Sequence, residues 1–563
     1  MIKFFFLIFF FIFSTLGYGL LLNQKILKND NQGSLGEIGL LGLFSTAFYA
    51  TFFHFFFPLG IYINISFHIL GCLFFFYYHK KFFINLKDFE ISTFFFSLLL
   101  AIILFYAHRP NEDFGFYHLP YIVNFTSEKI IFGLSSLQVQ QGWNSIWLNI
   151  HSAFVITNSD YKSIYILNSI FFIYIFSIFS FEIIQKINTQ NHNSKIIFYF
   201  SFLFLLFFLI KFSRLNSYGI DVPANYLLII SVLYFFKTFE SKKINLNHFM
   251  LICIFILFSI TARISNLPFS LLVIYLFFKN RYYYRVLFSK FFLFVFFFFS
   301  FWVLQQFIYT SCLIIPNELT CFNTLWYDEN FIKNFSESTL VINKSIEAYT
   351  GNLTNAEYYE NFRWVPTWFK RNGNELFEYL ITFCLPLIIL LVFIQEKKKN
   401  NMKYQVFNND IFFLIALLII CIFLWFYNSP VIRMGNHYIV LLIFSILIGL
   451  NFFKKIIFTK VPKKVVLSLI IFSFLFLGIK NFNRVNKIND NERNSFWPYF
   501  YNVNYNTVYK NNLSLNTIIP TGEPQASVCW DTPFICRTKN FDDISLNKTK
   551  KGYLLIKKIK KLN

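Results

Sequence analysis

The chain alternates between long apolar runs and shorter polar stretches. Fourteen largely apolar runs can be recognised, and most approach the length of about 20 residues that a helix needs to cross a bilayer core. The runs are continuous and do not alternate between apolar and polar positions, which excludes a membrane-spanning β-barrel. The pattern predicts an all-α polytopic membrane protein with about 14 transmembrane helices, within a range of 12–14. The runs span residues 2–22, 38–57, 61–78, 90–107, 163–184, 196–212, 222–237, 248–262, 267–278, 286–308, 377–395, 409–427, 437–452 and 464–480.

The charges between the runs indicate which side of the membrane each loop faces. Lysine and arginine concentrate in every second loop, and loops of this kind stay in the cytoplasm. With fourteen helices, these loops all lie on one side and both termini lie on the other. Lys3 is the exception, because it would lie on the outer side. The basic residues of these loops include Lys25, Lys28, Lys80, Lys81, Lys87, Lys186, Lys195, Lys237, Lys242, Lys243, Lys279, Arg281, Arg285, Lys397, Lys403, Lys454 and Lys464.

Composition agrees with a membrane protein and argues against a soluble domain or a nucleic-acid-binding protein. The chain is 56% hydrophobic and only 14% charged, which is unlike a soluble domain. Its net charge of +22 is explained by the cytoplasmic loops. No basic loop carries a recognition motif for nucleic acid, so we expect membrane lipids and no nucleic acid as partners. The run at residues 2–22 lacks a small-x-small cleavage site, so we expect it to remain as a span.

The outer side holds the larger loops and the C-terminal tail. We expect a transmembrane domain at residues 1–480 with outer loops at 108–161 and 309–376. From residue 481 the chain is rich in Asn, Tyr, Pro and Asp, which predicts a small α+β outer domain at 481–563. The expected strands of that domain include parts of residues 513–519 and 553–556.

Four of the eight cysteines lie on the outer side, in two close pairs. Neither pair has the CxxC spacing or the nearby histidines of a metal site. The pairs therefore predict two local disulfides, Cys312 with Cys321 and Cys529 with Cys536, in an oxidising compartment.

Few charged side chains lie beside the outer ends of the predicted helices, and these are the candidates for chemistry. Charge at a membrane edge is costly unless it pairs or lines a wet cavity. A guanidinium group can bind a phosphate with two hydrogen bonds, or it can pair with an acid or a lipid head group. The pattern leaves these alternatives open. The candidates for substrate binding are His118, Arg214, Asp221, Arg263, Arg433 and His437.

Two adjacent acids, Glu112 and Asp113, follow directly on an uncharged run. Either acid could deprotonate a hydroxyl group, or hold a divalent metal such as Mg²⁺ or Mn²⁺ with oxygen ligands. Neighbouring residues on a helix point about 100° apart, so the two acids do not share one role, and we assign the base or metal ligand to Asp113. The alternative is a helix start, where carboxylates are favoured. We expect no other cofactor, because no P-loop, HExxH, nucleophile elbow or dinucleotide fingerprint is present.

Three segments resemble an uncharacterised bacterial family of multi-span membrane proteins. They are EDFGFYHLP at residues 112–120, PVIRMG at 430–435 and CWDTPFIC at 529–536. That family has a Tyr-His-Leu-Pro motif, a Pro-x-x-Arg-x-Gly motif and a Cys-Trp…Pro…Cys tail, but it supplies no reaction. The layout of an acidic outer loop, many spans and a small outer C-terminal domain also resembles the GT-C class of membrane glycosyltransferases. This chain departs from that class in one way, because three further spans precede its acidic loop.

The GT-C resemblance implies transfer of a sugar from a polyprenyl-phosphate donor to a cell-envelope glycan or lipid. The reaction would occur on the periplasmic face of the bacterial inner membrane, with Glu112 and Asp113 carried over as the acidic pair. Arg263 and Arg433, with Arg214 as a further candidate, would hold the phosphate. The alternatives are a polymerase or ligase of lipid-linked glycans, a transporter or flippase without transferase chemistry, and a structural membrane protein. Convergence of one acid and two arginines in one place would favour the enzyme over the structural protein.

Overall fold

The computed structural model describes most of the chain. The described residues are 1–29, 33–107, 113–156, 161–189, 192–211, 219–240, 245–315, 317–393, 408–450, 463–487, 496–498, 500, 503–509, 516–521, 528–537 and 543–559.

Each of the fourteen apolar runs contains a helix. Eleven of these helices are long and apolar enough to cross a membrane, so the prediction of an all-α, multi-pass membrane protein is confirmed. The eleven helices are α1 (Ile2–Lys25), α2 (Leu35–His54), α3 (Ile61–Asn85), α4 (Asp88–Tyr106), α7 (Tyr165–Lys186), α8 (His192–Lys211), α12 (Lys290–Thr310), α15 (Val365–Val392), α16 (Asn408–Asn428), α17 (Ile432–Gly449) and α19 (Lys463–Val485).

Three runs form helices shorter than a full span. They are α9 (Asp221–Lys237), α10 (Leu246–Ala262) and α11 (Ser270–Lys279). At 1.5 Å per residue, even 17 residues reach only about 25 Å, whereas the hydrocarbon core is about 30 Å thick. By length and composition, the described residues contain eleven helices that can cross a membrane, where the sequence predicted about fourteen spans.

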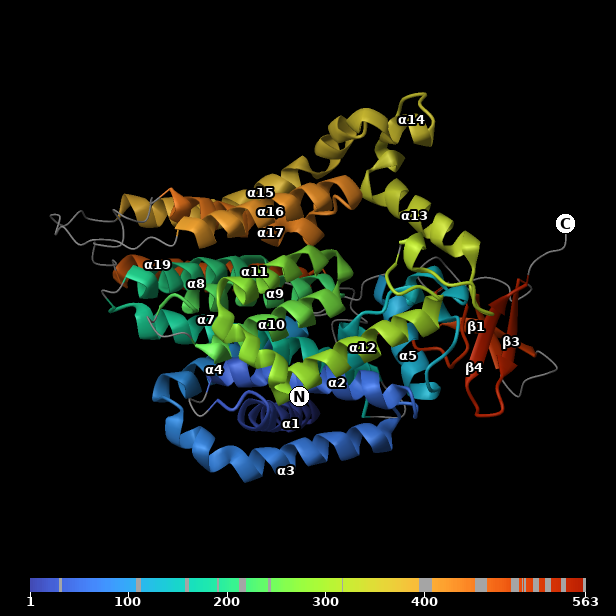
Figure 1. Ribbon diagram of the computed structural model, residues 1–563, viewed down its shortest axis with the longest axis horizontal. Helices are drawn as coiled ribbons and strands as arrows, with labels where there is room; N and C mark the ends of the chain where they lie inside the picture. Colours follow the sequence, from blue (N-terminus) through green and yellow to red (C-terminus); the bar gives the residue numbers. More distant parts are fainter. Residues whose placement is uncertain are drawn as a thin grey trace.

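The long helices form three layers (Figure 1). The hairpins of α1, α2 and α3 make one edge, with α4 beside α2; α15, α16 and α17 make the opposite edge, and α7 to α11 and α19 lie between them. Nearly all of α7 is buried, so this helix lies at the centre of the bundle. Close helix contact on the α1 side depends on glycine: a Cβ on Gly42 would lie 1.8 Å from the carbonyl oxygen of Thr15.

Ion pairs join the lysine-rich ends of several helices. Lys237 of α9 lies 2.7 Å from Glu182 of α7. Lys186, at the end of α7, pairs with Glu240 just after α9. Lys279, at the end of α11, pairs with Asp410 at the start of α16. These contacts bring several of the predicted lysine-rich loops to one end of the bundle.

Short helices and strands gather at the other end of the bundle (Figure 1). They include the π-helix η1 (Phe114–His118), α5 (Leu119–Ser127), α6 (Ile146–Ala153), α13 (Glu329–Asn343) and α14 (Asn355–Tyr359). The strands are β1 (Asn504–Tyr509), β2 (Asn516–Thr521), β3 (Ile544–Lys548) and β4 (Leu554–Lys558). They form two antiparallel pairs, β1 with β2 and β3 with β4.

The C-terminal strands pack onto the loop that follows α5. The backbone N–H of Phe132 donates to the carbonyl of Leu554 at 2.9 Å, and the N–H of Ile556 donates back to Phe132 at 2.9 Å. The expected strands overlap β2 and β4. Among the described residues beyond Val485 there are strands and no helix, and the expected boundary at residue 480 falls inside α19.

Candidate functional site

Four charged side chains from four elements meet at the end of the bundle that carries the strands. Asp113 directly precedes η1, Asp221 is the first residue of α9, Arg263 directly follows α10, and Arg433 lies in the first turn of α17. We call these four residues the Asp–Arg cluster. Two acids and two arginines give the cluster no net formal charge.

Asp221 is the centre of the cluster. Its Oδ2 lies 3.0 Å from Nε of Arg433, and its Oδ1 lies 3.2 Å from Nη1 of Arg263. Only 13% of its side chain is exposed. A carboxylate at the first residue of a helix is also favoured by the helix dipole. Asp221 therefore orients both arginines and is a positioning residue.

Arg263 is buried, and its guanidinium group donates hydrogen bonds to other residues of the chain. Its Nε donates to the Ser265 hydroxyl at 2.7 Å, and its Nη1 also donates to the side-chain oxygen of Asn225 at 3.3 Å. Its Nη2 donates to the backbone carbonyl of Met434. Asn225 in turn donates to the carbonyl of Arg433 at 2.9 Å. Arg263 thus ties α9 and α10 to the start of α17 and does not face solvent.

Arg433 and Asp113 form the open edge of the cluster. Nη2 of Arg433 lies 3.7 Å from Oδ2 of Asp113, and about half of each side chain is exposed, 52% and 42%. A contact of this length is looser than the bonds around Asp221. A ligand arriving from outside can therefore reach this guanidinium and this carboxylate together.

Tyr117 lies beside the same edge. Burial, together with the negative charges of Asp113 and Asp221, raises the pKa of its phenol well above the ordinary value. The phenol therefore stays protonated and can donate a hydrogen bond. Sequence reasoning did not single out Tyr117, although its position in the Tyr-His-Leu-Pro motif was a signal.

The two candidate histidines are buried. Burial lowers the pKa of His118 to about 3, with smaller contributions from His151 and Arg433. His118 is therefore neutral near pH 7 and cannot act as a cation for a phosphate. His437 lies on α17 with its ring against Tyr438, and its two ring nitrogens have no hydrogen-bond partner among the residues that the structure describes.

The three motif segments meet at the cluster. Residues 430–435 reach residues 112–120 through the contact of Arg433 with Asp113. The backbone N–H of Trp530, in the segment 529–536, donates to the carbonyl of Gly115 at 2.9 Å. A Cβ on Gly115 would lie 2.3 Å from the Trp530 ring, so only glycine allows this contact. The Trp530 ring thus covers the start of η1, next to Asp113.

Comparison with known proteins places the chain in a family without assigned activity. A family model described as a domain of unknown function (DUF8201) matches residues 1–440. The chain belongs to the DUF8201 family. No curated protein and no solved structure matches it. The DUF8201 segment contains all four residues of the Asp–Arg cluster and ends before Trp530 and the strands.

Both close cysteine pairs of this DUF8201 chain form disulfides, as predicted. Cys312 bonds to Cys321 and Cys529 bonds to Cys536. The second disulfide closes the loop that carries Trp530. Two other candidates, Glu112 and Arg214, lie outside the described residues.

The side chains that the structure describes do not form a metal site. Within the described ranges, no group of three or more His, Cys, Asp and Glu side chains is placed to hold a metal ion. Asp113 and Asp221 are each next to a guanidinium group, which opposes a second cation. The cluster therefore does not fit a metal held by protein ligands alone.

Proposed function

We propose that the chain is a GT-C-like membrane glycosyltransferase that uses a polyprenyl-phosphate sugar donor. The acceptor would be a glycan or lipid of the cell envelope, and the cluster would face the periplasm of a bacterial inner membrane. One observation carries the proposal. Asp113 and Arg433, a base and a phosphate-binding cation, lie side by side and half-exposed where the helices end.

The residues divide the work of transfer between them. Asp113 takes the proton of the acceptor hydroxyl, and the hydroxyl oxygen forms a bond to the anomeric carbon of the sugar. The bond from that carbon to the phosphate oxygen breaks, and polyprenyl phosphate leaves with the bonding electrons. Arg433 binds the charge that develops on this phosphate. Asp221 and Arg263 hold Arg433 in place, and no step requires a metal.

The first test is binding of polyprenyl phosphate to the full chain in detergent. Arg433→Lys keeps the charge but removes the planar fork of donors, so affinity should fall about tenfold or more. Arg363→Lys, an exposed arginine in the outer loop, is the matched control and should bind as the wild type does. Equal binding by both variants would exclude Arg433 from phosphate recognition.

The second test is transfer from a panel of polyprenyl-phosphate hexoses. Asp113→Asn should lower the rate of sugar transfer about 100-fold or more, because a general base contributes on the order of 10²–10⁴. The matched control is Glu360→Gln, an exposed acid in the outer loop. Full activity of Asp113→Asn would rule out Asp113 as the general base. Transfer that requires a preassembled oligosaccharide donor would identify a polymerase or ligase.

A transporter or flippase is the second candidate, and one observation favours it. The buried acids Glu37 and Glu182 lie near Lys237 at the lysine-rich end of the bundle. Lys237 is 2.7 Å from Glu182, and Tyr234 donates to Glu37. Ionisable residues within a membrane often mark a transport path. The candidates are separated by proteoliposomes that contain lipid-linked sugar and no acceptor. Movement of the lipid-linked sugar across that membrane would favour the transporter.

A further inference from the structure

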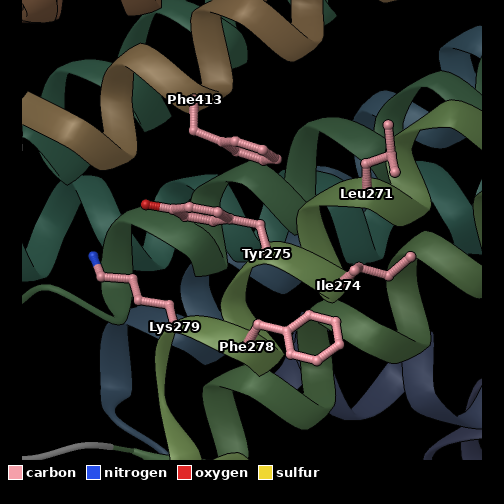
Figure 2. A pocket seen from close by; sticks show the side chains of 6 residues that line it. All are labelled: Leu271, Ile274, Tyr275, Phe278, Lys279 and Phe413. Atoms are coloured by element: carbon pink, nitrogen blue, oxygen red, sulfur yellow. The ribbon is translucent and has the colours of Figure 1, made fainter.

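A groove opens on the side of the bundle between α11 and α16 (Figure 2). Its volume is about 540 Å³. It lies toward the lysine-rich end of the bundle, because Lys279 ends α11 and Asp410 lies in the first turn of α16. The lining side chains are Leu271, Ile274, Tyr275, Phe278, Lys279 and Phe413.

The polar end of the groove is held in place by side-chain contacts. The Tyr275 ring stacks on Phe413 with a centroid distance of 3.9 Å, and its hydroxyl donates to Asp410 at 2.8 Å. Lys279 also bonds to Asp410, which is buried. An ammonium group has three N–H donors, and 42% of the Lys279 side chain is exposed. Lys279 can therefore bind a ligand while it keeps its bond to Asp410.

The apolar floor of the groove follows one face of α11. Leu271, Ile274 and Phe278 are spaced by three and four residues, so they lie in one row along the helix. All three are exposed in the bundle. The ten residues of α11 span about 15 Å, close to half of the hydrocarbon thickness of a bilayer. The row itself rises about 10 Å along the helix, so it fits within one lipid leaflet, with Lys279 at its surface end.

Basic residues follow α11 directly in the sequence. Between Lys279 and Lys290 the chain has four basic residues and no acid. This segment includes the 3₁₀ helix η6 (Arg281–Phe288), which folds against the end of α11 with Tyr284 and Phe277 at a ring distance of 4.6 Å. Asp410 balances one of the four charges. The segment therefore offers three uncompensated positive charges at the level of lipid head groups.

We infer that this groove binds a phospholipid with an anionic head group. One acyl chain lies along the row of Leu271, Ile274 and Phe278, and the phosphate contacts Lys279 and the arginines of η6. An apolar row that fits within one leaflet, with an excess of positive charge following it in the chain, argues for this occupant. The site is at the opposite end of the bundle from the Asp–Arg cluster, so it is independent of the proposed function.

The experiment is native mass spectrometry of the full chain in detergent with defined lipids. Phosphatidylglycerol and phosphatidylcholine with identical acyl chains are the probes. The wild type should retain one phosphatidylglycerol about tenfold more strongly than phosphatidylcholine. Arg281→Gln combined with Arg285→Gln should remove most of this preference. The matched control for charge is Lys463→Gln combined with Lys464→Gln, two exposed lysines that begin α19.

A second variant tests the groove without changing charge. Ile274→Trp should fill the groove and reduce retention of phosphatidylglycerol about tenfold, while Ile471→Trp, on an exposed face of α19, should not. Because both changes are at exposed positions, folding is expected to survive. Equal retention of the two lipids, or loss in the controls alone, would reduce the groove to ordinary contact with bulk lipid. A stable dimer that loses its second copy on Ile274→Trp would also overturn the inference.

Discussion

Arg263 and Arg433 carry the same charge and contact the same carboxylate, yet their surroundings assign them different roles. Arg263 is buried and donates to Asp221, Asn225, Ser265 and a backbone carbonyl. Arg433 is half-exposed and shares its charge between Asp221 and Asp113. From the sequence, we expected both arginines to bind the phosphate. In the structure only Arg433 is open to a ligand, and Arg263 stabilises the fold.

Replacement of each arginine should therefore affect different properties. Arg263→Met leaves Asp221 short of a partner and Met434 without its donor, so the free energy of unfolding should fall by about 3–5 kcal/mol. Arg433→Met should change it by about 1 kcal/mol, because much of this side chain is solvated. Thermal unfolding of both variants in the same detergent measures the difference. Equal destabilisation would contradict the division of roles.

The buried His118 makes stability depend on pH. Its pKa is lowered to about 3 in the folded chain, mainly by burial, against about 6.5 in the unfolded chain. Between these values the unfolded chain binds more protons, so stability is complete above about pH 6.5 and falls as the pH is lowered toward 3. One such group changes the free energy of unfolding by at most about 1.4 kcal/mol per pH unit.

Comparison of the wild type with His118→Gln at pH 7.0 and pH 5.0 tests this dependence. The glutamine cannot titrate, so the variant should lose less stability than the wild type over this range. Thermal unfolding at the two pH values is the measurement. An equal loss in both proteins would assign the titration to other groups, such as His151, whose pKa burial also lowers, to about 4.

At the scale of helices, the apolar runs predicted where each helix lies in the sequence but not which helices pack together. Every predicted span contains a helix, because twenty apolar residues in a membrane have few other ways to satisfy their backbone. The short helices α9, α10 and α11 were predicted at nearly the observed bounds, but counting them as full spans exceeded the eleven found. Asp221 and Arg263 are 42 residues apart on different helices. Their contact depends on helix packing, which hydrophobic pattern does not specify.

The charged group at the other end of α9 provides a test of helix packing. Lys237 is the ion-pair partner of Glu182, and both Glu182 and Glu37 are buried. Lys237→Met would leave buried carboxylates without a cation and should cost about 3–5 kcal/mol of unfolding free energy. The double variant with Glu182→Gln should recover part of this loss.

The matched control is a pair whose lysine is more exposed, 39% against 13% for Lys237. Lys548 and Glu128 lie 3.3 Å apart at the surface of the C-terminal strands. Lys548→Met should cost less than about 1 kcal/mol. If both lysine variants lost the same stability, burial would not be what makes the α7–α9 pair important.

At the scale of the whole molecule, the two ends of the bundle differ in chemistry. One end joins lysine-rich helix ends through ion pairs. The other end holds two disulfides, the strands and the Asp–Arg cluster. The sequence indicated this division, because the lysine-rich loops between the predicted spans contain neither of the two close cysteine pairs. It could not indicate that Trp530 covers Gly115, because the two residues are over 400 positions apart and neither is charged.

This division predicts how the protein lies in its membrane. Disulfides form in oxidising compartments, and lysine-rich loops remain in the cytoplasm. Both rules assign the strand end to the outer side, and they rest on different physics, since one concerns redox chemistry and the other translocation of charge.

Labelling with a membrane-impermeant maleimide tests the assignment. Glu360→Cys should react in spheroplasts whose inner membrane is intact. Lys25→Cys should react only after that membrane is broken. The native cysteines that remain free lie within helices, so they contribute little background. The opposite labelling would place the Asp–Arg cluster in the cytoplasm, and a periplasmic transferase would then have to be abandoned even if the cluster bound a phosphate.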